Sequence, residues 1–132
     1  GGHPVSAAVS LKNIDIVNEE NLPENAAKME KYIKNRLSEF ADHPFVGDIR
    51  GRGLLLGIEL VTDKEKKTPI SLTQANGIIQ NCIKEGVFLM RNGNTVPGLG
   101  NILIMAPPLI LKENEADQIV DAIGKSLNMA LN

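Results

Sequence analysis

The stretch over residues 46–61, VGDIRGRGLLLGIELV, constrains the fold of this chain more than any other segment. Its second half, residues 54–61, is a short apolar run, which predicts a strand buried in a sheet. The four glycines in the stretch allow a tight turn or the close approach of another group. Arg50 stands near the start of the apolar run, where its guanidinium could bind a carboxylate through two parallel hydrogen bonds. The stretch therefore predicts two strands, or one strand with a glycine break, beside a site for a small acid.

The composition is that of an ordinary globular protein. The 132 residues are enough for one compact domain or for a piece of a larger protein, and 42% of them are hydrophobic. A net charge of −2 and an aromatic content of 3% argue against a nucleic-acid partner. No apolar run is long enough to cross a bilayer, and the first five residues lack the features of a signal peptide. The single cysteine, Cys82, is typical of a reducing compartment, so we expect a cytoplasmic location.

The sequence predicts four helices, the first from its mix of alanine, valine, leucine and isoleucine and the other three from apolar residues at helical spacing. We expect them over residues 5–18, 23–40, 72–85 and 113–127. The apolar residues of the first helix are not confined to one face, so we expect that helix to be largely buried. Pro23 suits the first turn of the second helix. Ser71 and Gln74 have the spacing of a capping box, which would begin the third helix.

Short apolar runs between these helices predict the strands of an α+β fold. We expect strands over residues 45–49, 54–61, 87–90 and 102–106. Residues 62–69 carry several charges and predict a solvated loop, and residues 91–100 are rich in glycine and asparagine and predict a loop or hairpin connection. The connections favour a small antiparallel or mixed β-sheet with helices packed on one face, in a single domain over residues 1–132.

Four separated motifs resemble the sequence of a known enzyme family. They are Gly2-His3-Pro4-Val5-Ser6-Ala7-Ala8, HPFVGDIRGRG over residues 43–53, GIEL over residues 57–60 and PPLI over residues 107–110. In this order they resemble the C-terminal part of class III aminotransferases, the pyridoxal-phosphate-dependent enzymes of fold type I that include the ω-amino acid transaminases. The resemblance covers nearly the whole chain. It implies the C-terminal small domain of a longer, homodimeric enzyme whose large cofactor-binding domain is absent here.

The resemblance also implies a reaction that this chain does not complete. In the family, the lysine that forms the Schiff base and a threonine that reaches the cofactor phosphate both lie upstream of the Gly-His-Pro motif. We therefore expect no catalytic, cofactor-binding or metal-binding residue in this chain, and no transaminase activity of the chain alone. The whole enzyme would bind pyridoxal 5'-phosphate and transfer an amino group from an amine or amino acid to a keto acid. Residues 91–101 are similar to members that use pyruvate as the acceptor.

Two arginines are the candidates for binding substrate. Arg50 matches the family arginine that binds the substrate carboxylate. The alternative for Arg50 is an ion pair with Asp48 or Glu59 at the end of a strand. Arg91 matches, loosely, a mobile arginine that swings in some members to admit carboxylates or large apolar groups. The simpler interpretation of Arg91 is an exposed loop arginine.

Other residues of chemical interest have simpler structural interpretations. His3 and His43 each precede a proline at a turn, and Cys82 lies on an apolar helical stripe typical of a core. No spacing of histidines, cysteines or carboxylates suggests a metal site. Two other classes of function remain open from the sequence. One is a stand-alone regulatory module that binds an amino or keto acid through Arg50, and the other is a dimerisation module.

Overall fold

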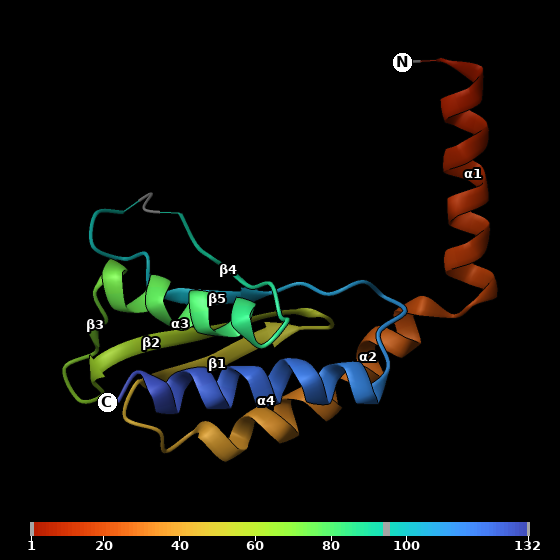
Figure 1. Ribbon diagram of the computed structural model, residues 1–132. Coiled ribbons are helices and arrows are strands. Elements are labelled where there is room, and N and C mark those ends of the chain that lie inside the picture. The colour runs from red at the N-terminus through yellow and green to blue at the C-terminus, as the bar shows by residue number, and fades with distance from the viewer. Residues whose placement is uncertain (1, 94–95, 132) are drawn as a thin grey trace.

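The computed structural model describes residues 2–93 and 96–131 and has four α-helices and one five-stranded sheet (Figure 1). The helices are α1 (Pro4–Glu19), α2 (Leu22–Leu37), α3 (Leu72–Lys84) and α4 (Glu113–Met129), and a 3-10 turn, η1 (Ser38–Phe40), follows α2. The strands are β1 (Val46–Arg52), β2 (Leu55–Asp63), β3 (Thr68–Pro69), β4 (Met90–Arg91) and β5 (Ile102–Met105). Asn94 and Thr95, in the predicted loop after β4, lie outside the described residues.

Every strand pair in the sheet is antiparallel, which confirms the predicted α+β fold. The strands lie in the order β1-β2-β5-β4, and β3 pairs with β2. β3 falls within residues 62–69, which the charge pattern predicts to be entirely loop. It forms because β2 continues to Asp63, further than the apolar run, and offers its backbone to Thr68 and Pro69.

Two of the four glycines of the opening stretch, Gly51 and Gly53, lie at the turn of the β1–β2 hairpin. Gly51 has φ +148° and Gly53 has φ +56°, values that favour glycine. A Cβ on Gly51 would lie 2.6 Å from the Cα of Leu56, which is too close for any other residue. The turn is also fixed from α2, because the Glu30 carboxylate accepts a hydrogen bond of 2.6 Å from the backbone N–H of Gly53.

The core lies between one face of the sheet and the helices α2, α3 and α4. Strand β2 alternates, with Leu56, Ile58 and Leu60 buried and Leu55 64% exposed. The buried strand residues share a cluster with the apolar faces of α2, α3 and α4. The capping box of Ser71 and Gln74 begins α3, as the sequence predicts. The opposite face of the sheet is free of these helices, so the fold confirms helices packed on one face.

Helix α1 differs from its prediction. The sequence predicts a largely buried helix, but α1 has no buried residue, and its Val5, Val9 and Leu11 are each at least 64% exposed. Figure 1 shows the reason: α1 extends away from the body of the domain, and no described element lies along its length. The prediction of a helix is correct, and the prediction of its burial within this chain is wrong.

Strand β4 is shorter than its prediction and lies later in the chain. Val87 and Leu89 are buried and Phe88 is 77% exposed, so residues 87–89 alternate as a strand does. However, of residues 87–91 only Met90 and Arg91 pair with β5, opposite Ile104 and Leu103. Among the described residues, no helix combines the length and the apolar character needed to span a membrane.

Candidate functional site

Arg50 lies on β1 between two carboxylates. Its Nη1 atom donates hydrogen bonds to Asp48 Oδ2 at 2.7 Å and to Glu59 Oε2 at 2.6 Å. The register explains the arrangement: Glu59 lies opposite Asp48, and Arg50 lies opposite Gly57, which has no side chain in the way. The hydrogen bonds that Arg50 donates to Glu59, and then to Asp48, raise the pKa of Arg50. The arrangement matches the ion-pair alternative for Arg50, with both predicted partners engaged at once.

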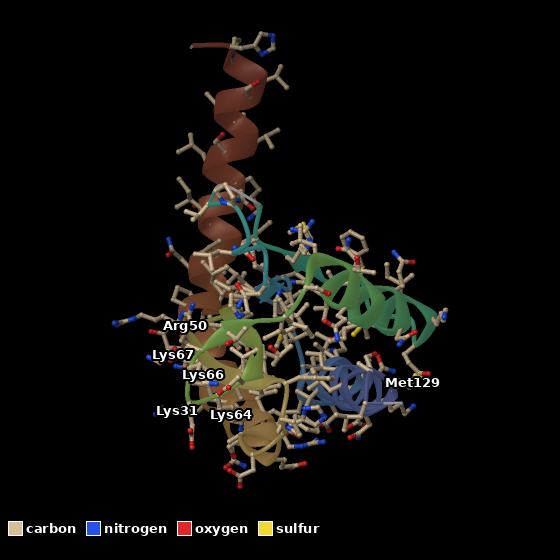
Figure 2. The ribbon with its side chains drawn as sticks, turned by 90° about the vertical axis from the view of Figure 1, so that its left-hand side faces the viewer. Lys31, Arg50, Lys64, Lys66, Lys67 and Met129 are labelled. Carbon is tan, nitrogen blue, oxygen red and sulfur yellow. The ribbon has the colours of Figure 1, made fainter. Side chains whose placement is uncertain are left out.

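A hollow of about 510 Å³ adjoins this ion-paired arginine. Lys64 and Lys67 line it together with the two carboxylates, and Figure 2 shows these lysines and Arg50 on the same side of the molecule. Lys64 donates to the Ala41 carbonyl oxygen at 2.7 Å. Arg50 itself is ion-paired with both carboxylates of this hollow, so its own charge is compensated.

Arg91 has a different environment, with uncharged partners. Its Nε donates to Asn76 Oδ1 on α3 at 2.9 Å, and its Nη1 donates to the Asn92 carbonyl oxygen at 3.0 Å. Among the described residues, no carboxylate forms an ion pair with Arg91. Its side chain is half-buried. Arg91 therefore combines a fixed position with a positive charge that no neighbouring anion offsets.

The loop that follows Arg91 is closed at its base by one side chain. Asn92 Nδ2 donates to the Leu99 carbonyl oxygen at 2.6 Å, and Asn92 Oδ1 accepts from the Ile102 N–H at 2.9 Å. Gly100 lies against the guanidinium, since a Cβ there would fall 2.7 Å from Arg91 Nη1. The residues around Arg91 therefore hold both ends of the loop and leave room for the guanidinium.

The two candidate arginines do not form one site. Arg50, Gly57, Ile104 and Met90 lie in one row across the four main strands. Arg91 follows Met90 and so lies on the opposite face of the sheet, at its other edge. The sequence predicts both residues as substrate-binding, and the structure separates them.

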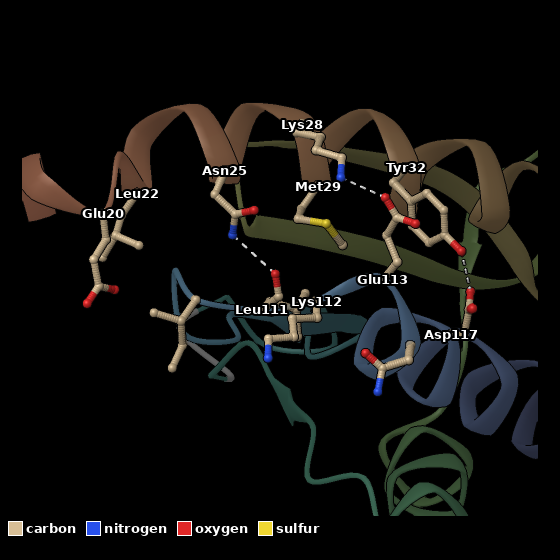
Figure 3. A pocket seen from close by; sticks show the side chains of 12 residues that line it. Glu20, Leu22, Asn25, Lys28, Met29, Tyr32, Leu111, Lys112, Glu113 and Asp117 are labelled. Atoms are coloured by element: carbon tan, nitrogen blue, oxygen red, sulfur yellow. Dashed lines mark hydrogen bonds and ion pairs between the residues drawn. The ribbon is translucent and has the colours of Figure 1, made fainter.

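The largest hollow, of about 820 Å³, lies where the starts of α2 and α4 meet (Figure 3). Two pairs of its polar side chains bond each other, and a third side chain bonds the backbone. Asn25 Nδ2 donates to the Leu109 carbonyl oxygen at 2.6 Å, Lys28 pairs with Glu113 at 2.8 Å, and Tyr32 donates to Asp117 at 2.9 Å. These contacts join α2 to the start of α4 and the segment before it.

Comparison with known proteins identifies the family. The family model described as aminotransferase class-III matches residues 1–127. The chain belongs to the class III aminotransferases.

Solved structures of transaminases share the fold of this class III chain. An aminotransferase of Bacillus anthracis is 40% identical, with a TM-score of 0.93 over 98% of this chain and 29% of its own. An amine transaminase from an uncultivated Pseudomonas species, solved in its PLP-bound form, is 32% identical, with a TM-score of 0.87 over 98% of this chain and 28% of its own.

Curated relatives of the class III chain include transaminases with named substrates. The putrescine–pyruvate aminotransferase of Pseudomonas aeruginosa is 39% identical over 96% of this chain and 27% of its own length. The taurine–pyruvate aminotransferase of Rhodobacter capsulatus is 34% identical over 96% of this chain and 28% of its own length. The chain thus spans a little over a quarter of the curated relatives it matches.

Class III aminotransferases depend on pyridoxal phosphate, and the lysines of this chain do not fit the role of its covalent anchor. A lysine that attacks a carbonyl is activated by burial or by a neighbouring cation. All ten lysines lie within the described residues, and nine are exposed. The tenth, Lys34, is half-buried but donates to Glu30 at 2.8 Å and to the Gly51 carbonyl oxygen at 2.7 Å. Within this chain, therefore, none of the lysines has the buried or cation-activated amine that a covalent anchor needs.

The other predicted residues have structural surroundings. His43 Nδ1 accepts a hydrogen bond from the Phe45 N–H at 3.2 Å, and burial followed by the charge of Lys64 lowers the pKa of His43. Cys82 is buried, and its thiol donates to Ser126 at 3.2 Å. No group of three or more histidine, cysteine or carboxylate side chains in the described part of the chain could hold a metal ion.

The sequence does not single out the partners of Arg91. Asn76 is an exposed residue of α3, 15 positions before Arg91, and only the packing of α3 beside β4 brings the two together. Gly100 carries a weak signal, because it belongs to a glycine-rich connection. A glycine near an arginine does not by itself indicate contact between them.

Proposed function

We propose that the whole protein is a homodimeric, pyridoxal-phosphate-dependent transaminase in which this chain is the small, substrate-gripping domain. It transfers an amino group from an amine or amino acid to a keto acid, with pyruvate as the candidate acceptor. The family membership and the relatives named for taurine, putrescine and pyruvate support this proposal. Because the chain spans a little over a quarter of those relatives, the cofactor and its anchoring lysine belong to the remainder of the protein.

The uncompensated charge of Arg91 is the observation that supports a substrate-gripping role. A substrate carboxylate that approaches Arg91 replaces hydrogen bonds to uncharged oxygens of Asn76 and Asn92. A carboxylate that approaches Arg50 must compete with Asp48 and Glu59, which already occupy the guanidinium. A bond between a guanidinium and a carboxylate is stronger than one to an amide oxygen. We therefore assign binding of the substrate carboxylate to Arg91, and a structural role in the β1–β2 hairpin to Arg50.

Kinetics of the full-length enzyme test this assignment. The reaction of the amino donor alone, followed in a single turnover without a keto acid, isolates one substrate at a time. We expect Arg91→Ala to lower kcat/KM for β-alanine by a factor of about 30, corresponding to about 2 kcal/mol, and to leave kcat/KM for propylamine nearly unchanged.

Arg50→Ala is the control, and we expect it to change kcat/KM for both donors by similar factors. A selective loss of β-alanine turnover in Arg50→Ala, with none in Arg91→Ala, would reverse the assignment. Absence of amino transfer from any amine in the full-length enzyme would refute the proposed function itself.

A further inference from the structure

Three segments define the position of the Arg91 guanidinium. Asn76 from α3 accepts from Nε at 2.9 Å, the Asn92 carbonyl accepts from Nη1 at 3.0 Å, and Gly100 leaves the space beside Nη1. Of these three, Asn76 is the one that binds through a side chain. Substitution at position 76 can therefore change the hold on Arg91 without changing the backbone of the loop.

Apart from its hydrogen bond with Arg91, the Asn76 side chain has no structural role among the described residues. α3 begins with the capping box of Ser71 and Gln74, and its buried face consists of other residues. The side chain of Asn76 points out of this face and is exposed. Its amide oxygen accepts from Arg91, and no other partner of this side chain is found among the described residues.

A hydrogen bond to an uncharged acceptor positions an arginine, and a carboxylate, as a stronger acceptor, can replace it. An amide oxygen carries a partial charge, so its bond to a guanidinium is weaker than the ion pairs that hold Arg50. Because Asn76 is exposed, water can replace the guanidinium when Arg91 leaves. A substrate carboxylate can therefore draw Arg91 away from α3, whereas a substrate without a carboxylate offers nothing stronger than Asn76.

We propose that Asn76 is a positioning residue that holds Arg91 against α3 and so sets the preference of the enzyme between amines with and without a carboxylate. This inference rests on the substrate-binding role proposed above for Arg91. Replacing the amide with a carboxylate of the same shape would convert the hold into an ion pair. Arg91 would then remain on α3 when a carboxylate substrate arrives.

Asn76→Asp in the full-length enzyme tests the proposal. We expect KM for β-alanine to rise by about tenfold, and KM for propylamine and kcat for both donors to change little. Asn76→Ala removes the hold, and we expect it to lower KM for β-alanine. Asn128→Asp is the matched control, since it makes the same chemical change at an exposed position on α4 and should leave both KM values unchanged.

A double variant shows whether Asn76 acts through Arg91. If it does, Asn76→Asp should have no further effect on β-alanine in the Arg91→Ala background. Independent effects of the two changes, or equal effects of Asn76→Asp on β-alanine and propylamine, would overturn the positioning role. A selective effect of Arg91→Ala with none of Asn76→Asp or Asn76→Ala would overturn this inference and leave the proposed function intact. A full-length enzyme without transaminase activity would refute the proposed function instead.

Discussion

Arg50 and Arg91 are chemically identical side chains whose partners give them different capacities. Arg50 donates to two carboxylates, so its charge is already used within the hairpin. Arg91 donates to an amide oxygen and a backbone carbonyl, so its charge remains available. At the scale of single residues, the charge of the hydrogen-bond partner therefore decides which arginine can hold a further anion.

The effect of a glycine in a helix also depends on which side chains pack against it. Gly124 lies in the buried face of α4, where a Cβ would fall 2.7 Å from Cε1 of Phe40. Gly77 lies in α3, and a Cβ there would meet nothing within 4 Å. The two positions therefore separate the effect of packing from that of helix propensity.

We expect Gly124→Ala to lower the free energy of unfolding by about 1–3 kcal/mol, because the methyl group forces the Phe40 ring out of its place. Gly77→Ala should raise it by about 0.5–1 kcal/mol, because alanine favours the helix and has free space. Urea denaturation of the two variants measures both changes. Stabilisation by Gly124→Ala would mean that Phe40 does not pack on α4 as described.

At the scale of elements, α1 is a helix whose apolar side chains are not covered by the rest of this chain. Apolar residues lie on more than one side of it, and all of them are exposed or half-exposed in this chain. A helix that is apolar on several sides is typically covered by protein. We therefore expect the remainder of the longer protein to cover α1.

Val9→Lys tests this expectation in two forms of the protein. In the full-length enzyme we expect it to lower the free energy of unfolding by about 2 kcal/mol, since a buried valine would be replaced by a charge. In the 132-residue chain the change should stay within about 0.5 kcal/mol, because Val9 is 65% exposed there. Asn13→Lys, on the same helix, is the control and should be tolerated in both. Equal effects of Val9→Lys in the two forms would show that α1 is not covered in the longer protein.

The elements with the clearest local signals were predicted best. α4 and α2 carry apolar residues at helical spacing, and the residues predicted to face the core, such as Ile33, Val120 and Leu127, are buried. The extent of β4 and the existence of β3 could not be predicted, because each depends on how far a neighbouring strand continues. Whether α1 is buried within this chain could not be predicted from the sequence either. The pattern of apolar residues does not show whether the residues that pack on the helix belong to the same chain.

At the scale of the whole molecule, the order of the strands keeps the candidate residues apart. β1 and β4 are at opposite ends of the four-strand path, so Arg50 and Arg91 contribute to different surfaces. The lysines lie on the outside, and the largest hollow is lined by groups that join α2 to α4. Within this chain the two arginines therefore lie in separate environments, and nine of its ten lysines are exposed.

We accordingly expect the 132-residue chain, mixed with pyridoxal phosphate and reduced with borohydride, to show no stoichiometric adduct at one lysine. Exposed lysines should instead react weakly and at several positions, because none has a desolvated amine. Peptide mapping by mass spectrometry measures the distribution of adducts. A single fully modified lysine would contradict the conclusion that the cofactor anchor lies elsewhere in the protein.

The sequence by itself determined the four helices and the family resemblance, because these depend on residues close together in the chain or on motifs in fixed order. For the glycine-containing stretch it left two strands or one broken strand open, and the structure shows a hairpin. The sequence also identified both arginines as candidates. Only the tertiary structure showed that their partners differ, since it set Asp48 and Glu59 around Arg50 and Asn76 beside Arg91. The physical reason is that the availability of a charge depends on its neighbours in space, and strand pairing and helix packing choose those neighbours.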